Sequence, residues 1–123
     1  MGMRRLLIVD DEPRLLAAMS QYFSGAGYRV DVAADRERAL ELMRTPFDGV
    51  IVDLRLSGDD RAGVAVLRAA RAASSDAALL LLTALVGSEA HDAGADVVLE
   101  KPVRLADLES ALVGVMTLPR PPS

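Results

Sequence analysis

Near its start the chain reads Leu6-Leu7-Ile8-Val9-Asp10-Asp11, an uninterrupted apolar run that ends in two aspartates. The pattern recurs twice, because residues 50–52 lead to Asp53 and residues 97–100 lead to Lys101. Apolar runs of this kind are typical of buried parallel strands, and α/β folds bind ligands at the carboxyl ends of such strands. Three carboxylates and one ammonium are therefore expected in one shallow pocket. Like charges at ~5 Å in an effective dielectric of ~20 repel by about 3 kcal/mol per pair, so the pocket is expected to hold a divalent cation.

Composition limits the classes of protein to which the chain belongs. Its 123 residues suit one domain, and its hydrophobic fraction of 51% with only 3% aromatic residues predicts an aliphatic core. A net charge of −4 disfavours nucleic-acid binding by this domain, because that affinity comes from neutralising phosphates. The absence of cysteine excludes disulfides and cysteine–zinc sites.

The sequence also predicts where the protein acts. Its most apolar stretch, residues 77–86, is about half the length of a membrane span, so no membrane association is expected. The first strand begins within a few residues of the N-terminus, leaving no room for a signal peptide. A soluble, cytoplasmic protein is the expectation.

Strand and helix patterns alternate along the chain. The expected strands are residues 6–9, 28–33, 49–52, 78–82 and 97–99, and the expected helices are residues 13–25, 35–43, 62–73, 88–93 and 103–116. Five βα units in series predict a parallel sheet with right-handed crossovers and helices on both faces. Residues 1–117 are expected to form the domain, and the proline-rich residues 118–123 a tail or the start of a linker.

Between Arg4 and about Met116 the chain resembles the receiver domain of two-component response regulators. The resemblance rests on four motifs at strand ends, namely residues 9–12, residues 52–56, Leu82-Thr83-Ala84 and Lys101-Pro102. Each motif alone is weak, but four in the correct order are specific. The resemblance implies a flavodoxin-like, doubly wound sheet with strand order 2-1-3-4-5.

The resemblance also implies roles for the strand-end residues. Asp53 is the expected nucleophile, which accepts a phosphoryl group and becomes an acyl phosphate. Asp10 and Asp11 are expected to hold Mg²⁺, with Asp53 and the backbone carbonyl of Arg55 as further ligands. Glu12 either contacts the ion through water or caps the following helix, and the sequence leaves both alternatives open.

The remaining site residues are expected to act on the phosphoryl oxygens. Lys101 supplies a point charge, and the hydroxyl of Thr83 turns toward the new phosphate. Backbone amides of Leu54, Arg55 and Ala84 are further expected donors. The Lys101–Pro102 bond is predicted to be cis, as in the family it resembles.

The implied function is a phosphorylation-controlled switch. Its expected partners are a sensor histidine kinase or phosphotransfer protein as donor, and an effector domain or output protein as recipient, while homodimerisation is left open. No enzymatic activity is expected beyond self-phosphorylation and self-dephosphorylation. The alternative is a phosphorylation-independent interaction module. An aspartate-nucleophile phosphatase of the haloacid-dehalogenase type ranks far behind, because that family places its nucleophile after the first strand.

The chain departs from the family pattern at several positions. Val98 stands where receivers with an aromatic switch carry Tyr or Phe, which puts the usual readout in doubt. Thr83 and Lys101 are only eighteen positions apart, so the helix expected at residues 88–93 must be short. Residues 57–63 replace the usual loop and are about two residues longer. Asp59 and Asp60 there are interpreted as part of a solvated loop rather than a second ion site, and they could affect which kinase docks.

Three residues carry further predictions. Leu85 and the bulky Arg55 are expected to border the path of hydrolytic water, which predicts slow autodephosphorylation. His91, the only histidine, is interpreted as a partly exposed helix residue rather than a phosphodonor or metal ligand.

Overall fold

Five parallel strands form one sheet in the order β2-β1-β3-β4-β5, in a computed structural model that describes residues 3–74, 76–84 and 94–117. This confirms the predicted doubly wound fold and strand order. The strands are β1 (Arg5–Val9), β2 (Arg29–Ala33), β3 (Gly49–Asp53), β4 (Ala78–Thr83) and β5 (Val97–Glu100).

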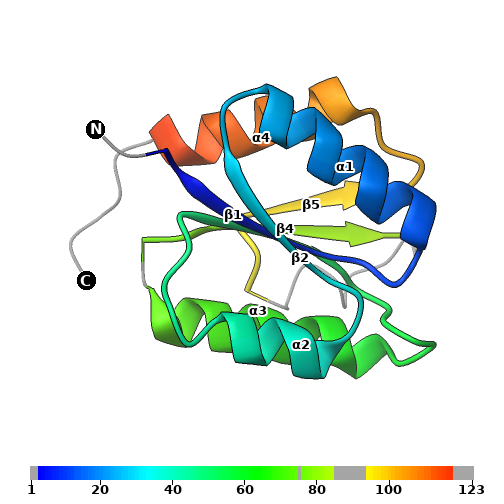
Figure 1. Cartoon of the computed structure of the whole chain (residues 1–123). Helices are drawn as coiled ribbons and strands as arrows, with labels where there is room; N and C mark the ends of the chain where they lie inside the picture. The colour runs from blue at the N-terminus through cyan, green and yellow to red at the C-terminus, as the bar shows by residue number, and fades with distance from the viewer. Residues whose placement is uncertain (1–2, 75, 85–93, 118–123) are drawn as a thin grey trace.

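Helices cover both faces of the sheet, as Figure 1 shows. One face carries α1 (Pro13–Gly25) and α4 (Leu105–Thr117), and the other carries α2 (Arg36–Leu42) and α3 (Asp60–Ala73). None of the helices in the described part of the chain has the length and hydropathy that crossing a bilayer requires.

The sheet divides the core into two clusters. Leu7 and Val52 belong to the cluster beneath α2 and α3, whereas Leu6 and Ile51 belong to the cluster beneath α1 and α4. Neighbouring residues face opposite clusters because side chains alternate along a strand. Nearly every residue of β1, β3 and β4 is buried, which explains why these strands are continuous apolar runs.

Most elements differ from the prediction by one or two residues at an end, and two of these differences bear on the site. α3 begins at Asp60, two residues earlier than expected, because the Asp59 carboxylate caps it by accepting a hydrogen bond from the Arg61 amide at 2.9 Å. β4 includes Thr83, which pairs with Glu100 of β5 instead of following the strand. The helix expected at residues 88–93, with His91, and the tail at residues 118–123 lie outside the described residues.

Gly63 lets the first turn of α3 approach the end of β3. Its amide donates to the carbonyl of Leu54 at 3.2 Å, and a Cβ at this position would meet the backbone carbonyls of Leu54 and Asp53 at well under 3.0 Å. A residue with a side chain does not fit there without a shift of the backbone. The close approach fixes the chain immediately after Asp53.

Candidate functional site

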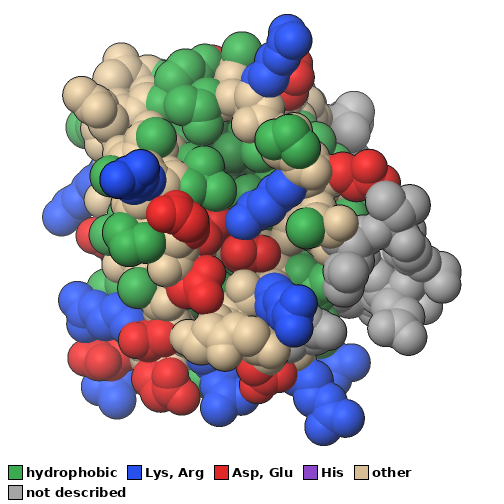
Figure 2. All heavy atoms as spheres, turned by 90° about the vertical axis from the view of Figure 1, so that its right-hand side faces the viewer, with side chains coloured by type: hydrophobic (Ala, Val, Ile, Leu, Met, Phe, Trp, Pro, Cys, Tyr) green, Lys and Arg blue, Asp and Glu red, His purple; other side chains and the backbone are tan. Residues whose placement is uncertain are grey.

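The predicted strand-end residues meet at the carboxyl edge of the sheet. Figure 2 looks onto this edge and shows acidic side chains gathered beside a basic one near the middle of the face. Asp10 follows β1, Asp53 ends β3, Thr83 ends β4 and Lys101 follows β5. Parallel strands end on the same side of a sheet, so four segments distant in sequence deliver their side chains to one place.

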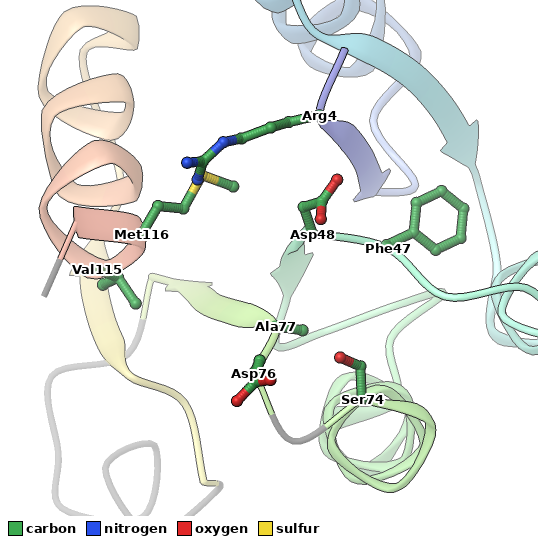
Figure 3. A pocket seen from close by; sticks show the side chains of 8 residues that line it. All are labelled: Arg4, Phe47, Asp48, Ser74, Asp76, Ala77, Val115 and Met116. Carbon is green, nitrogen blue, oxygen red and sulfur yellow. The ribbon is translucent and has the colours of Figure 1, made fainter. Parts of the chain in front are cut away.

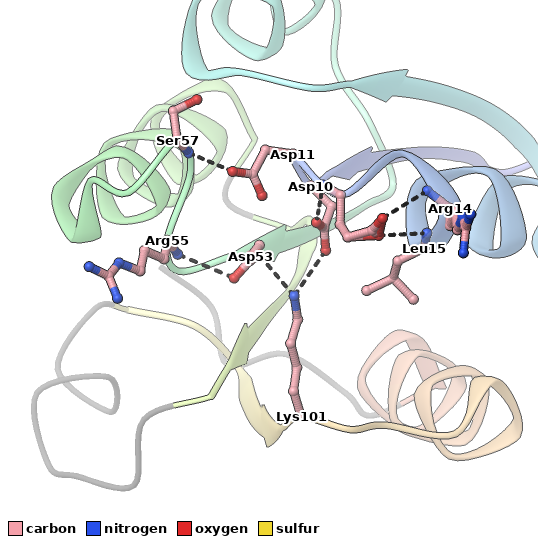
Figure 4. Close-up of polar contacts among 9 residues, drawn as sticks. Asp10, Asp11, Arg14, Leu15, Asp53, Arg55, Ser57 and Lys101 are labelled. Carbon is pink, nitrogen blue, oxygen red and sulfur yellow. Dashed lines mark hydrogen bonds and ion pairs between the residues drawn. The ribbon is translucent and has the colours of Figure 1, made fainter.

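Lys101 links two of the carboxylates. Its Nζ lies 2.8 Å from Asp53 Oδ2 and 3.2 Å from Asp10 Oδ2 (Figure 4). The backbone supports this position, because the Lys101 amide donates to the carbonyl of Thr83 at 2.8 Å, and the Lys101–Pro102 bond is cis, as predicted. Asp10 is fully buried and Asp53 is 7% exposed, so water screens these ion pairs weakly.

Burial and neighbouring charges shift the pKa values of Asp10 and Lys101. Burial raises the pKa of Asp10, and the neighbouring charge of Asp53 adds to the rise, while the Glu12 amide and Lys101 offset part of it. Burial lowers the pKa of Lys101, but the hydrogen bond to Asp53 and the charges of both aspartates outweigh it, so the pKa is raised overall. Lys101 therefore remains a cation across the physiological pH range.

Asp10, Asp11 and Asp53 form a set of oxygen donors suited to a hard cation. One carboxylate oxygen from each lies within 4.8 Å of the others. Asp10 and Asp53 are buried whereas Asp11 is exposed, so the set is open on one side, as a magnesium ion that retains water requires. The role of the Arg55 carbonyl as a further ligand remains a prediction.

The structure agrees with only some of the predictions for the other site residues. Thr83 is buried at the end of β4, at the same edge of the sheet as the carboxylates. The Leu54 amide was expected to donate to the phosphoryl group, and this expectation is wrong, because that amide extends the sheet by donating to the carbonyl of Leu82 at 2.8 Å. The Arg55 amide instead donates to Asp53 Oδ1 at 3.2 Å. Leu85 lies outside the described residues.

Glu12 caps α1, which favours one of the two alternatives left open by the sequence. Its carboxylate accepts hydrogen bonds from the amides of Arg14 and Leu15 at 3.3 and 3.5 Å. Its own amide donates to Asp10 Oδ1 at 2.9 Å and so orients that carboxylate. The start of α1 thus holds one face of the site in place.

A further unpredicted contact of the site involves Ser57. The backbone amide of Ser57 donates to Asp11 Oδ2 at 2.8 Å (Figure 4). It depends on a turn in which Ser57 and Gly58 both have positive φ, at 54° and 79°. The Ser-Gly pair signals a turn in the sequence, but no residue type reveals where the amide points.

A pocket of about 200 Å³ lies at the opposite edge of the sheet (Figure 3). Arg4 and Asp48, which precede β1 and β3, line it together with Met116 from the last turn of α4. The carboxylate site lies where the strands end, and this pocket lies where they begin, so the two are separate. Parallel α/β sheets bind their ligands at the carboxyl edge, which is the edge of the carboxylate site.

The geometry agrees with comparisons to known proteins. A family model described as the response regulator receiver domain matches residues 6–113. The transcriptional activator protein PfeR of Pseudomonas aeruginosa is 37% identical over 112 residues, which are 86% of this chain but 35% of PfeR. The chain therefore spans about a third of the length of this curated relative.

Solved structures share the fold. A CheY-like receiver domain protein from Methanospirillum hungatei has a TM-score of 0.84 at 27% identity, and the match covers 94% of each chain. A response regulator from Burkholderia pseudomallei, solved with a phosphorylated aspartic acid, a calcium ion and citrate, has a TM-score of 0.80 at 27% identity, and the match covers 89% of this chain and 66% of that one. The strand-end motifs, the fold and these matches together show that the chain belongs to the response regulator receiver domain family.

Proposed function

We propose that Asp53 is the phosphoacceptor of this domain and that the donor is a phosphohistidine on a sensor histidine kinase or phosphotransfer protein. One observation carries the proposal: the oxygens of three carboxylates and the Nζ of Lys101 converge at the carboxyl edge of the sheet in a member of the receiver family. The phosphorylated aspartic acid in the Burkholderia pseudomallei protein supports the same chemistry here.

In the proposed transfer, a carboxylate oxygen of Asp53 attacks the phosphorus atom. The bond from phosphorus to the donor's histidine nitrogen breaks, the nitrogen keeps the electron pair, and Asp53 becomes an acyl phosphate. Lys101 and the Arg55 amide hold the two oxygens of Asp53, so the carboxylate plane is set before the donor arrives. Phosphoryl transfer depends mainly on such positioning and on neutralising charge, and the Lys101 ammonium supplies part of both.

Mg²⁺ is the proposed cofactor, with Asp10, Asp11 and Asp53 as carboxylate ligands and the Arg55 carbonyl as a backbone ligand. When bound, the ion neutralises charge on the transferring phosphoryl group. The three convergent carboxylates suit a hard cation, and the calcium ion reported for the Burkholderia pseudomallei protein is a cation of the same class. Asp10 is held for this purpose by the Glu12 amide.

The phosphorylated domain is proposed to act as a cytoplasmic signalling switch read by an effector domain or output protein. We propose residues 1–117 as the domain and residues 118–123 as a tail or the start of a linker. The name of PfeR, a transcriptional activator, suggests control of transcription as the output of the whole protein. Turnover is limited to self-phosphorylation and self-dephosphorylation.

Labelling with a small phosphodonor tests the proposal directly. The wild-type domain, incubated with acetyl phosphate and Mg²⁺, should gain one phosphoryl group by intact mass, and Asp53→Asn should gain none. Asp76→Asn is the matched control, because this exposed carboxylate lines the pocket at the far edge of the sheet and should leave labelling unchanged. Labelling of Asp53→Asn at the wild-type level would rule out Asp53 as the acceptor.

The alternative of a phosphorylation-independent interaction module was suggested by Val98 and by the short helix expected at residues 88–93, which lie outside the described residues. Val98 is half-buried in β5 beside Leu81, where receivers with an aromatic switch place a ring. A folded wild-type domain that accepts no phosphoryl group from acetyl phosphate would support this alternative.

A further inference from the structure

We propose that the loop Arg55–Asp59, between β3 and α3, is coupled to the metal site through the backbone amide of Ser57. This amide positions Asp11 to receive the cation, and the bound cation in turn orders the loop. The inference rests on the Mg²⁺ site proposed above, and it assigns a positioning role to a backbone group of this chain.

Asp11 is the ligand that most needs support. Asp10 and Asp53 are buried and held by neighbouring groups, whereas Asp11 is exposed. An exposed carboxylate samples several rotamers, and fixing it on binding costs free energy. The hydrogen bond from the Ser57 amide at 2.8 Å holds Oδ2 and leaves Oδ1 to act as a ligand.

The turn around Ser57 places this amide. Leu56 and Asp59 exchange two backbone hydrogen bonds, at 3.2 and 3.0 Å, which close a two-residue turn over Ser57 and Gly58. Both central residues have positive φ, and such turns are tight and well defined. The base of the turn is anchored, because Leu56 is buried in the core and Asp59 caps α3.

A second hydrogen bond joins the same loop to the site. The Arg55 amide donates to Asp53 Oδ1 at 3.2 Å, so alternate residues of the loop bind carboxylates at the ends of two different strands. Hydrogen bonds to ionised acceptors are strong, and their strength depends on the charge of the acceptor. A cation that fixes Asp11 and Asp53 in their present rotamers therefore keeps both acceptors within reach of the loop amides.

Linkage makes the coupling reciprocal. If the ordered loop raises the affinity for the cation by some factor, the cation stabilises the ordered loop by the same factor. Ser57, Gly58 and Asp59 are exposed, so a change in the loop is visible at the protein surface. This route from the site to the surface does not require an aromatic ring at Val98.

Calorimetric titration with MgCl₂ tests the inference on the whole chain. Gly58→Val puts a β-branched residue at a φ of 79°, which forces the turn to change, although no neighbouring atom lies within 4 Å of the new Cβ. The expected result is a dissociation constant for Mg²⁺ about three- to tenfold higher, which corresponds to the net contribution of one typical protein hydrogen bond. Ser57→Gly is the matched control, since it keeps the amide and tolerates the positive φ, and its affinity should stay within about twofold of wild type. Unchanged affinity in Gly58→Val would overturn the inference.

Amide exchange of the wild-type protein gives a second readout that needs no variant. Saturating Mg²⁺ should slow exchange of the Ser57 amide by about the same three- to tenfold factor. If the wild type binds Mg²⁺ and Ser57 exchange does not change, the coupling is wrong while the proposed metal site stands. If the wild type binds no Mg²⁺, both the metal site and the coupling are wrong.

Discussion

Replacing Gly63 with alanine should destabilise the domain, although alanine is the better helix former. Gly63 lies in the first turn of α3, where a Cβ would come well within 3.0 Å of the carbonyl oxygens of Leu54 and Asp53. Both obstacles are backbone atoms at the end of β3, so rotation of a side chain cannot relieve the overlap. Either α3 moves outward or the end of β3 bends.

The expected magnitude follows from three contributions. Helix propensity favours alanine by about 1 kcal/mol. Overpacking against a rigid neighbour costs about 1–3 kcal/mol, and an outward shift of α3 also weakens the hydrogen bond from the Gly63 amide to Leu54, worth about 1 kcal/mol. The free energy of unfolding should therefore fall by about 1–3 kcal/mol.

Urea unfolding followed by far-ultraviolet circular dichroism measures this effect, since the chain has no tryptophan for fluorescence. Gly114→Ala is the matched control, because Gly114 lies in α4 with no atom within 4 Å of a new Cβ. This control should gain about 0.5–1 kcal/mol. If the two variants are equally stable, the close approach of α3 to β3 does not constrain the fold as described.

Three further predictions concern the site and its surroundings. Burial raises the pKa of Asp10 above 3.8, so wild-type stability falls as the pH rises from 3.8 through the folded-state pKa. In urea unfolding at pH 7, Asp10→Asn should therefore be more stable than wild type, and this advantage should disappear in acid. The hydrogen bond to Glu109 raises the pKa of Tyr22, so the contribution of this hydrogen bond to stability is complete below pH 10 and is lost as the pH rises through the folded-state pKa. In an absorbance titration, Glu109→Gln should lower the pH at which Tyr22 ionises. Leu85→Asn should speed the decay of the acyl phosphate, and an unaltered decay rate would count against the shielding role of Leu85.

The sequence predicted the sheet and the convergence of the site because both depend on residue type. Central strands buried on two faces must be apolar throughout, which made β1, β3 and β4 visible as continuous runs. Once these strands were assigned as parallel, Asp10, Asp53 and Lys101 had to meet at one edge. The ion pairs of Lys101 with both aspartates confirm that expectation.

What the sequence did not predict depends on backbone groups. The amides of Leu54 and Ser57 carry no signature in the sequence, and their partners follow from the exact path of the chain after β3. The start of α3 was misplaced for a different reason, since the side chain of Asp59, rather than an apolar pattern, decides where the helix begins. The role of Glu12 was not decided by the sequence, because a carboxylate before a helix can either cap the helix or contact an ion. Only its hydrogen bonds to the helix amides distinguish the two roles.

The position of Asp53 in β3 has a consequence for the order in which parts of the domain unfold. Every residue of β3 is buried, and the strand is flanked by β1 on one side and β4 on the other. Such a central strand opens only when the whole domain unfolds, whereas edge strands and exposed turns open at a much lower free energy. The proposed phosphoacceptor is therefore the final residue of the segment that opens last. The domain can take up and lose a phosphoryl group many times while its least stable parts change conformation around a fixed carboxylate.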